Sequence, residues 1–400
     1  MKFVFFNIPT SGHVNPALAL TAGLVEAGHE VITYLTPGYR DKVLATGSAF
    51  RAYPEDVVND EYFSAVARRF NPPRLATILL DSARELLPQL RTDLEREQPA
   101  AVLYDSMCPW GRLAARAVSL PAVTSMTLLD LGLPQLIKSG FAGEALRLLI
   151  QNAPWMGRLF RAMWRLRRTH GLPVAPFPKV LNWAGDLTLV YTARRFWPRS
   201  DGLGDEYVFV GPPIRPRPDQ SGFPFERLDP ERSLLYVSLG TVFNDNPDFF
   251  RQCIAAFGQR EMQVVMALGE QVQAADLGTI PDNIIVWPYV PQLEILPQTS
   301  LFITHGGMNS VHEGLYHDVP LLLVPQQVEQ GLVAVRVAEM GAGLVLHDGR
   351  ATAAQLRAAS NQVLNEPGYR ASAAELGAAL RATGGVPRAV AAMETFVGRR

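Results

Sequence analysis

The chain has 400 residues, more than one hydrophobic core usually contains, so two domains are expected. Hydrophobic residues make up 48% and charged residues 19%, as in a typical globular enzyme, and the net charge of −1 gives no reason to expect nucleic acid or an anionic membrane as partner. The two cysteines, Cys108 and Cys253, are far apart, which argues against a disulfide framework and fits a reducing cytoplasm. Asn7 and Pro9 end the first apolar run, so neither a signal peptide nor a transmembrane span is expected there.

Strands and helices alternate through the first half of the chain. Strands are expected at residues 2–7, 30–35, 100–104, 121–126 and 187–191, and helices at 16–27 and 110–118. The first helix would begin after Asn15-Pro16, which supply a cap and a first-turn proline, and would end at Gly28. This βαβ alternation predicts a doubly wound parallel sheet.

Residues 155–168 predict a cationic amphipathic helix. Apolar residues fall at 155, 156, 159, 160, 163 and 164, and arginines at 158, 161, 165 and 168 form the other face. The simplest interpretation is a surface helix that packs inward. A lid over a substrate site and a loose contact with a membrane surface are the alternatives.

The alternation restarts after residues 211–222, a segment rich in proline and glycine that reads as a linker. Strands are expected at 234–238, 263–267, 284–287, 301–304, 321–324 and 343–346, with a helix at 248–257. Residues 385–400 again have helical spacing. The second half therefore predicts a second parallel sheet.

The most informative stretch surrounds Gly306-Gly307. A buried strand precedes it, and a helix at 308–317 follows, whose unpaired N-terminal N–H groups suit a diphosphate. His305 and Ser310 can donate to phosphate oxygens, while the Glu313 carboxylate can accept from ribose hydroxyls. The alternative is an ordinary βα turn in which Ser310 caps the helix.

Together with Val290-Pro-Gln292 before this stretch and Pro325…Glu329-Gln330 after it, these residues resemble the nucleotide-sugar signature of UDP-dependent glycosyltransferases that act on small molecules, in particular the bacterial macrolide and flavonoid enzymes. The resemblance implies the α/β GT-B fold, in which two Rossmann-like domains with doubly wound parallel sheets face a cleft. The implied organisation is an acceptor domain at 1–210, a linker at 211–230, a nucleotide-sugar domain at 231–384, and a terminal helix at 385–400 that packs back on the first domain.

The candidate catalytic residues follow two strands of the first half. His13 comes after the first strand and Asp105 ends the strand at 100–104, so both should lie at the carboxyl edge where open α/β sheets bind ligands. The resemblance implies that His13 is the catalytic base and that Asp105 holds its tautomer and stabilises the imidazolium. The alternatives are a hydrogen-bonding or capping histidine and an aspartate that caps the next helix.

The resemblance assigns the second domain to the donor. The expected nucleotide contacts are Ser238, Gly240, Thr241, Tyr289, Val290, Gln292, His305, Gly307, Asn309, Ser310 and Glu313, and the expected sugar contacts are Glu329 and Gln330. Many relatives carry tryptophan where Tyr289 stands, so either Tyr289 or the nearby Trp287 would stack on uracil. Glu329 and Gln330 could instead be no more than a polar helix start.

The expected activity is inverting transfer of a sugar, most simply glucose, from a UDP-sugar to a hydroxyl of a hydrophobic acceptor. The UDP-sugar is a co-substrate; no cofactor is expected, and no metal, because neither His-Glu-x-x-His nor Asp-x-Asp is present. The expected partners are the donor and the acceptor, without nucleic acid or stable membrane insertion, in the cytoplasm. A UDP-sugar epimerase and a non-catalytic nucleotide-sugar-binding protein are the competing functions.

Overall fold

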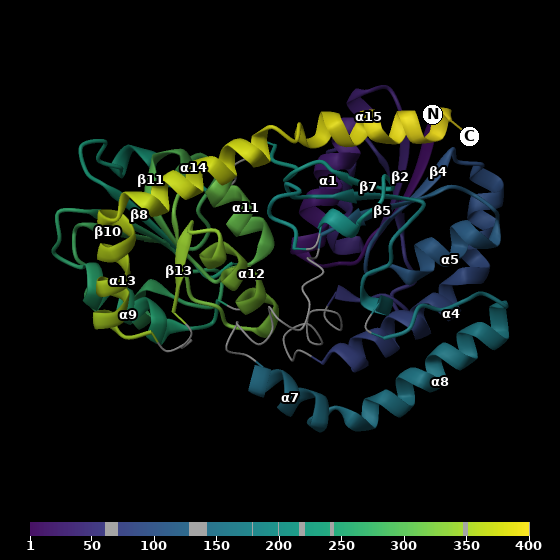
Figure 1. Cartoon of the computed structure of the whole chain (residues 1–400), viewed down its shortest axis with the longest axis horizontal. Helices are drawn as coiled ribbons and strands as arrows, with labels where there is room; N and C mark the ends of the chain where they lie inside the picture. Colours follow the sequence, from purple (N-terminus) through teal and green to yellow (C-terminus); the bar gives the residue numbers. More distant parts are fainter. Residues whose placement is uncertain are drawn as a thin grey trace. The chain divides into compact units, whose positions relative to one another are not determined.

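A computed structural model describes residues 1–60, 71–127, 142–177, 179–198, 200–215, 221–240, 244–346 and 351–399. The chain forms two compact units (Figure 1). Unit 1 comprises Met1–Asp130, Leu146–Ile214 and Thr383–Arg400, and unit 2 comprises Leu131–Ala145 and Arg215–Ala382. Each unit contains one parallel sheet, as the alternation of strands and helices predicts.

Within the described residues, the sheet of unit 1 has seven strands in the order β3-β2-β1-β4-β5-β6-β7. The strands are β1 (Lys2–Phe6), β2 (Glu30–Leu35), β3 (Ala49–Ala52), β4 (Ala101–Asp105), β5 (Ala122–Met126), β6 (Leu187–Val190) and β7 (Tyr207–Phe209). The α-helices that lie wholly in this unit are α1 (Ser11–Glu26), α2 (Arg40–Leu44), α4 (Pro72–Glu97), α5 (Pro109–Ala117), α8 (Ala153–His170) and α15 (Gly385–Gly398). Helix α7 (Ala142–Gln151) belongs to unit 1 from Leu146 onward. Five of these elements, β3, β7, α2, α4 and α7, were not predicted from the sequence.

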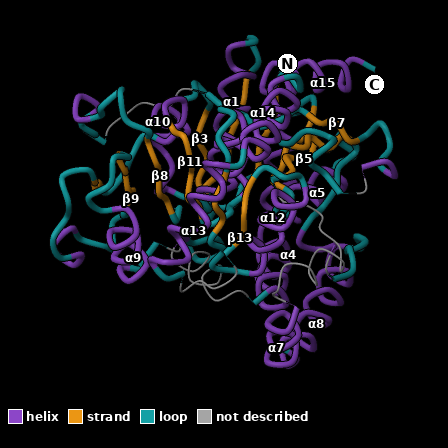
Figure 2. Tube along the Cα trace, turned by 60° about the vertical axis from the view of Figure 1, so that its left-hand side comes forward, coloured by secondary structure: helices purple, strands orange, loops and turns teal. Residues whose placement is uncertain are grey.

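Helices cover both faces of this sheet, because successive side chains of a buried strand point to opposite sides. Val4 and Phe6 belong to the core that the sheet forms with α4, α5 and α8. Phe3 and Phe5 belong to the core on the other face, which also contains residues of α1 and α15. The C-terminal helix is therefore part of unit 1, and both ends of the chain lie close together in Figures 1 and 2.

The first helix begins earlier than the sequence analysis expected. Thr10 precedes it in an extended conformation, and its carbonyl oxygen accepts from the backbone N–H groups of His13 and Val14, each at 2.9 Å. Pro16 lies inside the helix, where its missing N–H removes one hydrogen bond near the N-terminal end. The prediction that Asn15-Pro16 start the helix was wrong, and His13 lies in the first turn.

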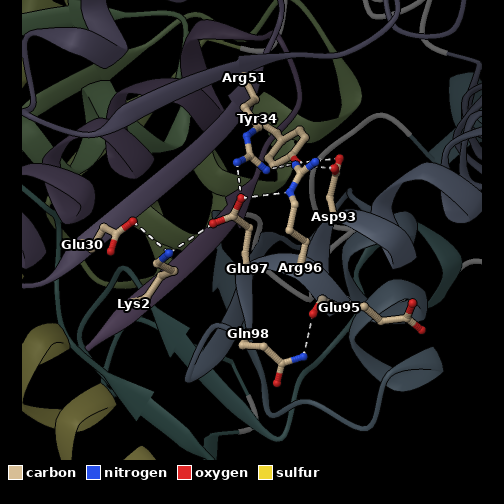
Figure 3. Close-up of polar contacts among 9 residues, drawn as sticks. All are labelled: Lys2, Glu30, Tyr34, Arg51, Asp93, Glu95, Arg96, Glu97 and Gln98. Atoms are coloured by element: carbon tan, nitrogen blue, oxygen red, sulfur yellow. Dashed lines mark hydrogen bonds and ion pairs between the residues drawn. The ribbon is translucent and has the colours of Figure 1, made fainter.

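A polar cluster fastens the end of α4 to β1, β2 and β3 (Figure 3). The ammonium of Lys2 lies 3.1 Å from carboxylate oxygens of both Glu30 and Glu97. Arg51 donates to Glu97 and, at 3.0 Å, to the Tyr34 hydroxyl. Hydrogen bonds from Arg51 and Lys2 lower the pKa of Glu97 to about 2. This cluster and the core below it fix α4, against which α8 packs.

Helix α8 packs inward through only part of the expected face. Leu159, Ala162 and Leu166 are its buried residues and contribute to the core shared with α4. Phe160 and Trp164, which the sequence analysis placed on the packed face, are 60% and 58% exposed. The predicted face was confirmed for Leu159, Met156 and Met163 and was wrong for Phe160 and Trp164, because the buried stripe runs through Ala162 and Leu166 instead.

In the part of unit 2 that is described, the sheet has six strands in the order β10-β9-β8-β11-β12-β13. The strands are β8 (Leu234–Ser238), β9 (Gln263–Ala267), β10 (Ile284–Trp287), β11 (Thr299–Thr304), β12 (Leu321–Leu323) and β13 (Gly343–Val345). The α-helices are α9 (Pro247–Phe257), α10 (Gln292–Ile295), α11 (Met308–Tyr316), α12 (Val328–Glu339), α13 (Ala353–Asn365) and α14 (Pro367–Arg381).

The core on one face of this sheet contains Val237, Met266 and Ile303 together with residues of α9 and α13. Helix α11 packs closely on the sheet at Gly314, where a Cβ would come within 2.9 Å of Leu321 and 3.1 Å of Phe302. The glycine therefore allows α11 to lie directly against β11 and β12, which fixes the N-terminus of the helix at their carboxyl ends.

Candidate active site

In unit 1, His13 and Asp105 lie side by side at the carboxyl edge of the sheet. Their strands β1 and β4 are neighbours, with Phe6 opposite Tyr104. The His13 Nδ1 atom lies 2.7 Å from Asp105 Oδ2, and the aspartate side chain is fully buried whereas that of His13 is 12% exposed. A carboxylate accepts hydrogen bonds only, so in a neutral imidazole that donates to it Nδ1 carries the hydrogen and Nε2 has the lone pair.

The surroundings of Asp105 contradict its interpretation as a helix cap. Its Oδ1 atom accepts from the Met107 backbone N–H at 2.8 Å, before the helix begins. Cys108 is the residue preceding α5, and its side chain makes no capping hydrogen bond. Both carboxylate oxygens are therefore held, one by the backbone and one by His13, which fixes the orientation of the imidazole.

Thr127 is a third member of this group that the sequence analysis missed. Its hydroxyl oxygen lies 2.8 Å from His13 Nδ1 and 3.5 Å from Asp105 Oδ2. The signal that could have revealed it is positional: Thr127 directly follows β5, which is the neighbour of β4. A polar residue after each of three adjacent strands marks one edge of the sheet.

In unit 2 the predicted phosphate turn follows β8. Ser238 ends this strand opposite Thr304 of β11, and its hydroxyl oxygen accepts from the Gly240 N–H at 3.2 Å. Gly240 has φ +78°, a conformation that favours glycine. Thr241 lies outside the described residues. The turn after β8 and the turn after β11 are thus adjacent in the sheet.

The His305 ring is enclosed between these two turns. A Cβ on Gly240 would come within 2.6 Å of the ring, and a Cβ on Gly307 within 2.4 Å. Burial lowers the pKa of His305 to about 4, partly opposed by a hydrogen bond with the Ser238 backbone. Without a bound anion the imidazole is therefore neutral near pH 7, and it can offer a phosphate a hydrogen bond.

The first turns of α11 bring together three of the predicted residues. The Gln292 amide nitrogen donates to Glu313 Oε2 at 2.6 Å and lies 3.5 Å from the Ser310 hydroxyl. Gly307 precedes the helix and no side chain caps it, so the interpretation of Ser310 as a cap was wrong. Asn309 lies in the first turn, and Gln292 positions one oxygen of Glu313.

Two aromatic residues near the end of β10 have different environments. The Trp287 indole N–H donates to the Ser221 carbonyl at 3.0 Å, and its ring packs edge-on to Phe223. Tyr289 is 52% exposed, whereas the next residue, Val290, is buried. Tyr289 therefore has the more accessible ring of the two candidates for uracil stacking.

Glu329 and Gln330 lie in the first turn of α12, after β12. Glu329 is exposed. The Gln330 side-chain carbonyl accepts from the Gln326 backbone N–H at 2.8 Å, and Gln330 is buried. The turn before α12 thus depends on Gln330, and its amide nitrogen is the group that could reach a sugar hydroxyl. Whether these residues recognise sugar stays a prediction.

Among the described residues, no group of three or more His, Cys, Asp or Glu side chains is arranged to hold a metal ion, and metal independence stays a prediction. None of the described helices is long and apolar enough to cross a membrane.

Known proteins resemble this chain in sequence and in structure. Residues 251–393 match the family described as Erythromycin biosynthesis protein CIII-like, C-terminal domain. The uncharacterized UDP-glucosyltransferase YojK of Bacillus subtilis is 31% identical over 96% of this chain and 95% of its own length. The NDP-glycosyltransferase YjiC of Bacillus licheniformis is 32% identical over 98% of this chain and 96% of its own length. A crystal structure of the glycosyltransferase of kitacinnamycin is 27% identical and superposes with a TM-score of 0.82 over 98% of both chains.

The alignments with the two Bacillus enzymes span nearly the whole of each chain, and the structural match covers both units. The predicted fold class is therefore confirmed, as is the resemblance read from the sequence. The chain belongs to the family of nucleotide-sugar-dependent glycosyltransferases with the GT-B fold and is a glycosyltransferase.

Proposed function

We propose that this glycosyltransferase moves glucose from UDP-glucose to a hydroxyl of a hydrophobic small molecule, such as a macrolide, a flavonoid or another phenol, with inversion at the anomeric carbon. The observation that carries the proposal is the hydrogen-bonded pair of His13 and the fully buried Asp105. A hydroxyl is a poor nucleophile until a base removes its proton, and imidazole is the side chain best suited to this task near neutral pH.

The pair performs the chemistry as follows. Because the Nδ1–H of His13 donates to Asp105, the Nε2 lone pair takes the proton of the acceptor hydroxyl. The acceptor oxygen bonds to the anomeric carbon while the bond from that carbon to the β-phosphate oxygen breaks, and UDP leaves with the electron pair. The Asp105 carboxylate stabilises the imidazolium that forms. In-line displacement on an α-linked donor gives a β-glycoside.

Unit 2 holds the donor in this proposal. The N-terminus of α11 offers backbone N–H groups to the diphosphate, and the neutral His305 adds a hydrogen bond. Tyr289 stacks on uracil, Glu313 accepts from the ribose, and Glu329 and Gln330 contact glucose. The name of the relative from Bacillus subtilis supports UDP-glucose as donor, and that of the erythromycin family supports a macrolide-like acceptor.

The test is to incubate the protein with UDP-glucose and a panel of phenols and macrolides, and to analyse the products by mass spectrometry. A glycoside whose anomeric proton coupling is that of a β-linkage would support the proposal. Recovery of an epimerised UDP-sugar would point to an epimerase, and UDP-glucose binding without any product to a binding protein. Activity should survive EDTA, because the described residues contain no group of three or more His, Cys, Asp or Glu side chains that could hold a metal ion. Loss that Mn²⁺ restores would contradict this.

His13→Ala should lower transfer to alcohols on the order of a hundredfold or more, because the base is gone. The rate of transfer to acidic phenols should fall less, because a phenol releases its proton more easily than an alcohol does. UDP affinity, measured by titration, should stay at the parent value. His170→Ala is the matched control: its ring lies 3.1 Å from the Arg84 carbonyl, on helices α8 and α4. Parent rates with alcohols in His13→Ala would contradict the role of His13.

A further inference from the structure

Helix α8 carries a concentrated positive charge that the composition of the whole chain conceals. Its 18 residues include Arg158, Arg161, Arg165, Arg167 and Arg168, and no Asp or Glu. The whole chain, by contrast, has a net charge of −1. Only a partner that contacts this helix locally would experience the positive charge, since charges farther than about 10 Å are screened at ordinary salt concentrations.

The outer face of α8 contains an apolar stripe. Ala153, Gly157, Phe160 and Trp164 are all exposed, and their spacing of four, three and four residues places them in one stripe. This stripe lies opposite the buried Leu159, Ala162 and Leu166, which pack toward α4. Figures 1 and 2 show α8 running beside α4. An inward-packing surface helix has no need of a phenylalanine and a tryptophan on its solvent side.

Arginines flank this stripe and form a basic pocket beside it. Arg158, Arg161 and Arg165 line a pocket of about 310 Å³ that Asp81 of α4 and Trp155 also line. Three guanidinium groups face one carboxylate there, so the pocket has surplus positive charge. The Arg158 guanidinium lies 4.4 Å from the centre of the Trp155 ring, which orders that side of the pocket.

The preceding helix α7 also has exposed apolar side chains. Leu146 and Ile150 are one turn apart and are 60% and 68% exposed. These two residues, Phe160 and Trp164 are four of the seven large hydrophobic side chains recorded as exposed in the described residues. They concentrate in one stretch of the chain, not over the surface as a whole.

We propose that α8, together with the end of α7, docks on a bilayer surface that contains anionic phospholipid. The lipid phosphates pair with the arginines, and Phe160 and Trp164 enter the boundary between headgroups and acyl chains, as in interfacial amphipathic helices. A second copy of this helix is disfavoured because two arginine-rich surfaces repel. The docking requires no membrane-spanning helix, and it does not depend on the identity of the donor or acceptor.

The test is flotation of the purified full chain with vesicles of equimolar phosphatidylglycerol and phosphatidylcholine, compared with vesicles of phosphatidylcholine alone. The protein should float with the anionic vesicles only, and added salt should release it. Vesicles with brominated acyl chains should quench part of the tryptophan fluorescence, because Trp164 reaches the boundary. This measurement on the parent protein needs no variant to fold.

Two variants separate the charge from the apolar stripe. Arg161→Gln/Arg165→Gln/Arg168→Gln should weaken binding to anionic vesicles on the order of a hundredfold, at about fivefold for each arginine. Phe160→Ser/Trp164→Ser should weaken it at least about tenfold and remove the quenching. The matched controls are Arg91→Gln and Leu44→Ser, which change an exposed arginine and an exposed leucine elsewhere in unit 1 and should bind as the parent does.

The proposal is overturned if the parent protein binds neither kind of vesicle, or binds neutral vesicles equally well. It is also overturned if both α8 variants bind like the two controls. Binding that only the arginine variant weakens would mean that the surface recognises negative charge without a bilayer interior, as an acidic protein surface would supply, and would likewise reject the membrane.

Discussion

Replacing Gly307 with alanine should displace the His305 imidazole and weaken UDP binding. The new Cβ would lie 2.4 Å from His305 Nε2 and 3.0 Å from Cε1. Ordinary contacts begin near 3.4 Å, so the ring must move by about 1 Å. The backbone itself is no obstacle, since Gly307 has φ −63° and ψ 141°, which alanine adopts readily.

A shift of about 1 Å takes a donor out of the 2.7–3.2 Å range of N–H···O hydrogen bonds. A hydrogen bond to a charged group contributes about 1.5–3 kcal/mol, so the Kd of UDP should rise by roughly 10- to 100-fold. Isothermal titration of UDP into the parent and the variant measures this directly. Gly368→Ala in α14 is the matched control, because a Cβ there would meet nothing within 4 Å. It should leave the affinity for UDP unchanged.

A double-mutant cycle tests the cause. If Gly307→Ala acts by moving the imidazole, then adding it to His305→Ala should cost no further affinity, whereas independent effects would add. The reasoning would be refuted by a folded Gly307→Ala protein that binds UDP within twofold of the parent. If the losses of UDP affinity in the two single variants add fully in the double variant, displacement of His305 is not the cause.

Three further results are expected. Asp105→Asn should lower the transfer rate at least about tenfold with little change in melting temperature, since it keeps the shape but cannot stabilise an imidazolium; full activity with a lower melting temperature would contradict it. Burial lowers the pKa of His305 to about 4 and of His312 to about 3. Below pH 6.5 these two histidines therefore bind protons in the unfolded chain but stay neutral in the folded chain. The free energy of unfolding should therefore fall between pH 6.5 and 5, by up to about 2 kcal/mol per histidine, and His312→Gln should make this fall shallower in urea titrations. Gln330→Ala should weaken UDP-glucose more than UDP in parallel titrations, whereas equal losses would mean that Gln330 only supports the turn at Gln326.

Most strands were predictable because each is a short apolar run between turn residues. Residues 234–238, 263–267 and 284–287 were predicted with the bounds that the structure gives. The edge strands β3 and β7 were not predicted. They end the sheet of unit 1, and Ala49–Ala52 contains an arginine and no continuous apolar run, so tertiary pairing with β2 decides its conformation.

The helices were harder to predict where local signals conflict with packing. Asn15-Pro16 is a good local start for a helix, yet the chain is already helical at Ser11, where the Thr10 carbonyl oxygen accepts from the N–H groups of His13 and Val14. In α8 a broad apolar pattern suggested burial of Phe160 and Trp164. Which stripe faces α4 depends on the fit between two helices, and sequence spacing alone does not contain it.

The candidate site was largely predictable because polar residues that follow strands collect at one edge of a parallel sheet. Those predictions place each residue at the edge of a sheet, but they do not say which side chain it contacts. The hydrogen bond from Gln292 to Glu313 depends on how two turns that are distant in sequence come together. The hydrogen bond that Gln330 accepts from Gln326 depends on a single side-chain torsion. Thr127 was missed for a different reason. The motifs that carried the family resemblance do not include it, although its position directly after the predicted strand could have been recognised in the sequence.

The two units use the same feature of the doubly wound sheet to collect these residues. In unit 1 the strands that follow β1 in the chain, β2 and β3, lie on one side of β1 in the sheet, and β4 lies on its other side. The connections that leave β1 and β4 therefore run in opposite directions. In unit 2 the corresponding place lies between β8 and β11. Loops diverge at such a switch point and leave a crevice at the carboxyl edge.

The strongest predicted residues flank these two places. His13 follows β1 and Asp105 ends β4, while Ser238 ends β8 and His305 follows β11. Neighbouring strands end at the same edge, so each pair is brought together by strand order, whatever the lengths of the connections between them. His13 and Asp105 are 92 residues apart in sequence and 2.7 Å apart in space for this reason. A substitution that shifts the register of β1 against β4 should therefore abolish transfer as completely as the loss of His13 itself, even if both side chains remain.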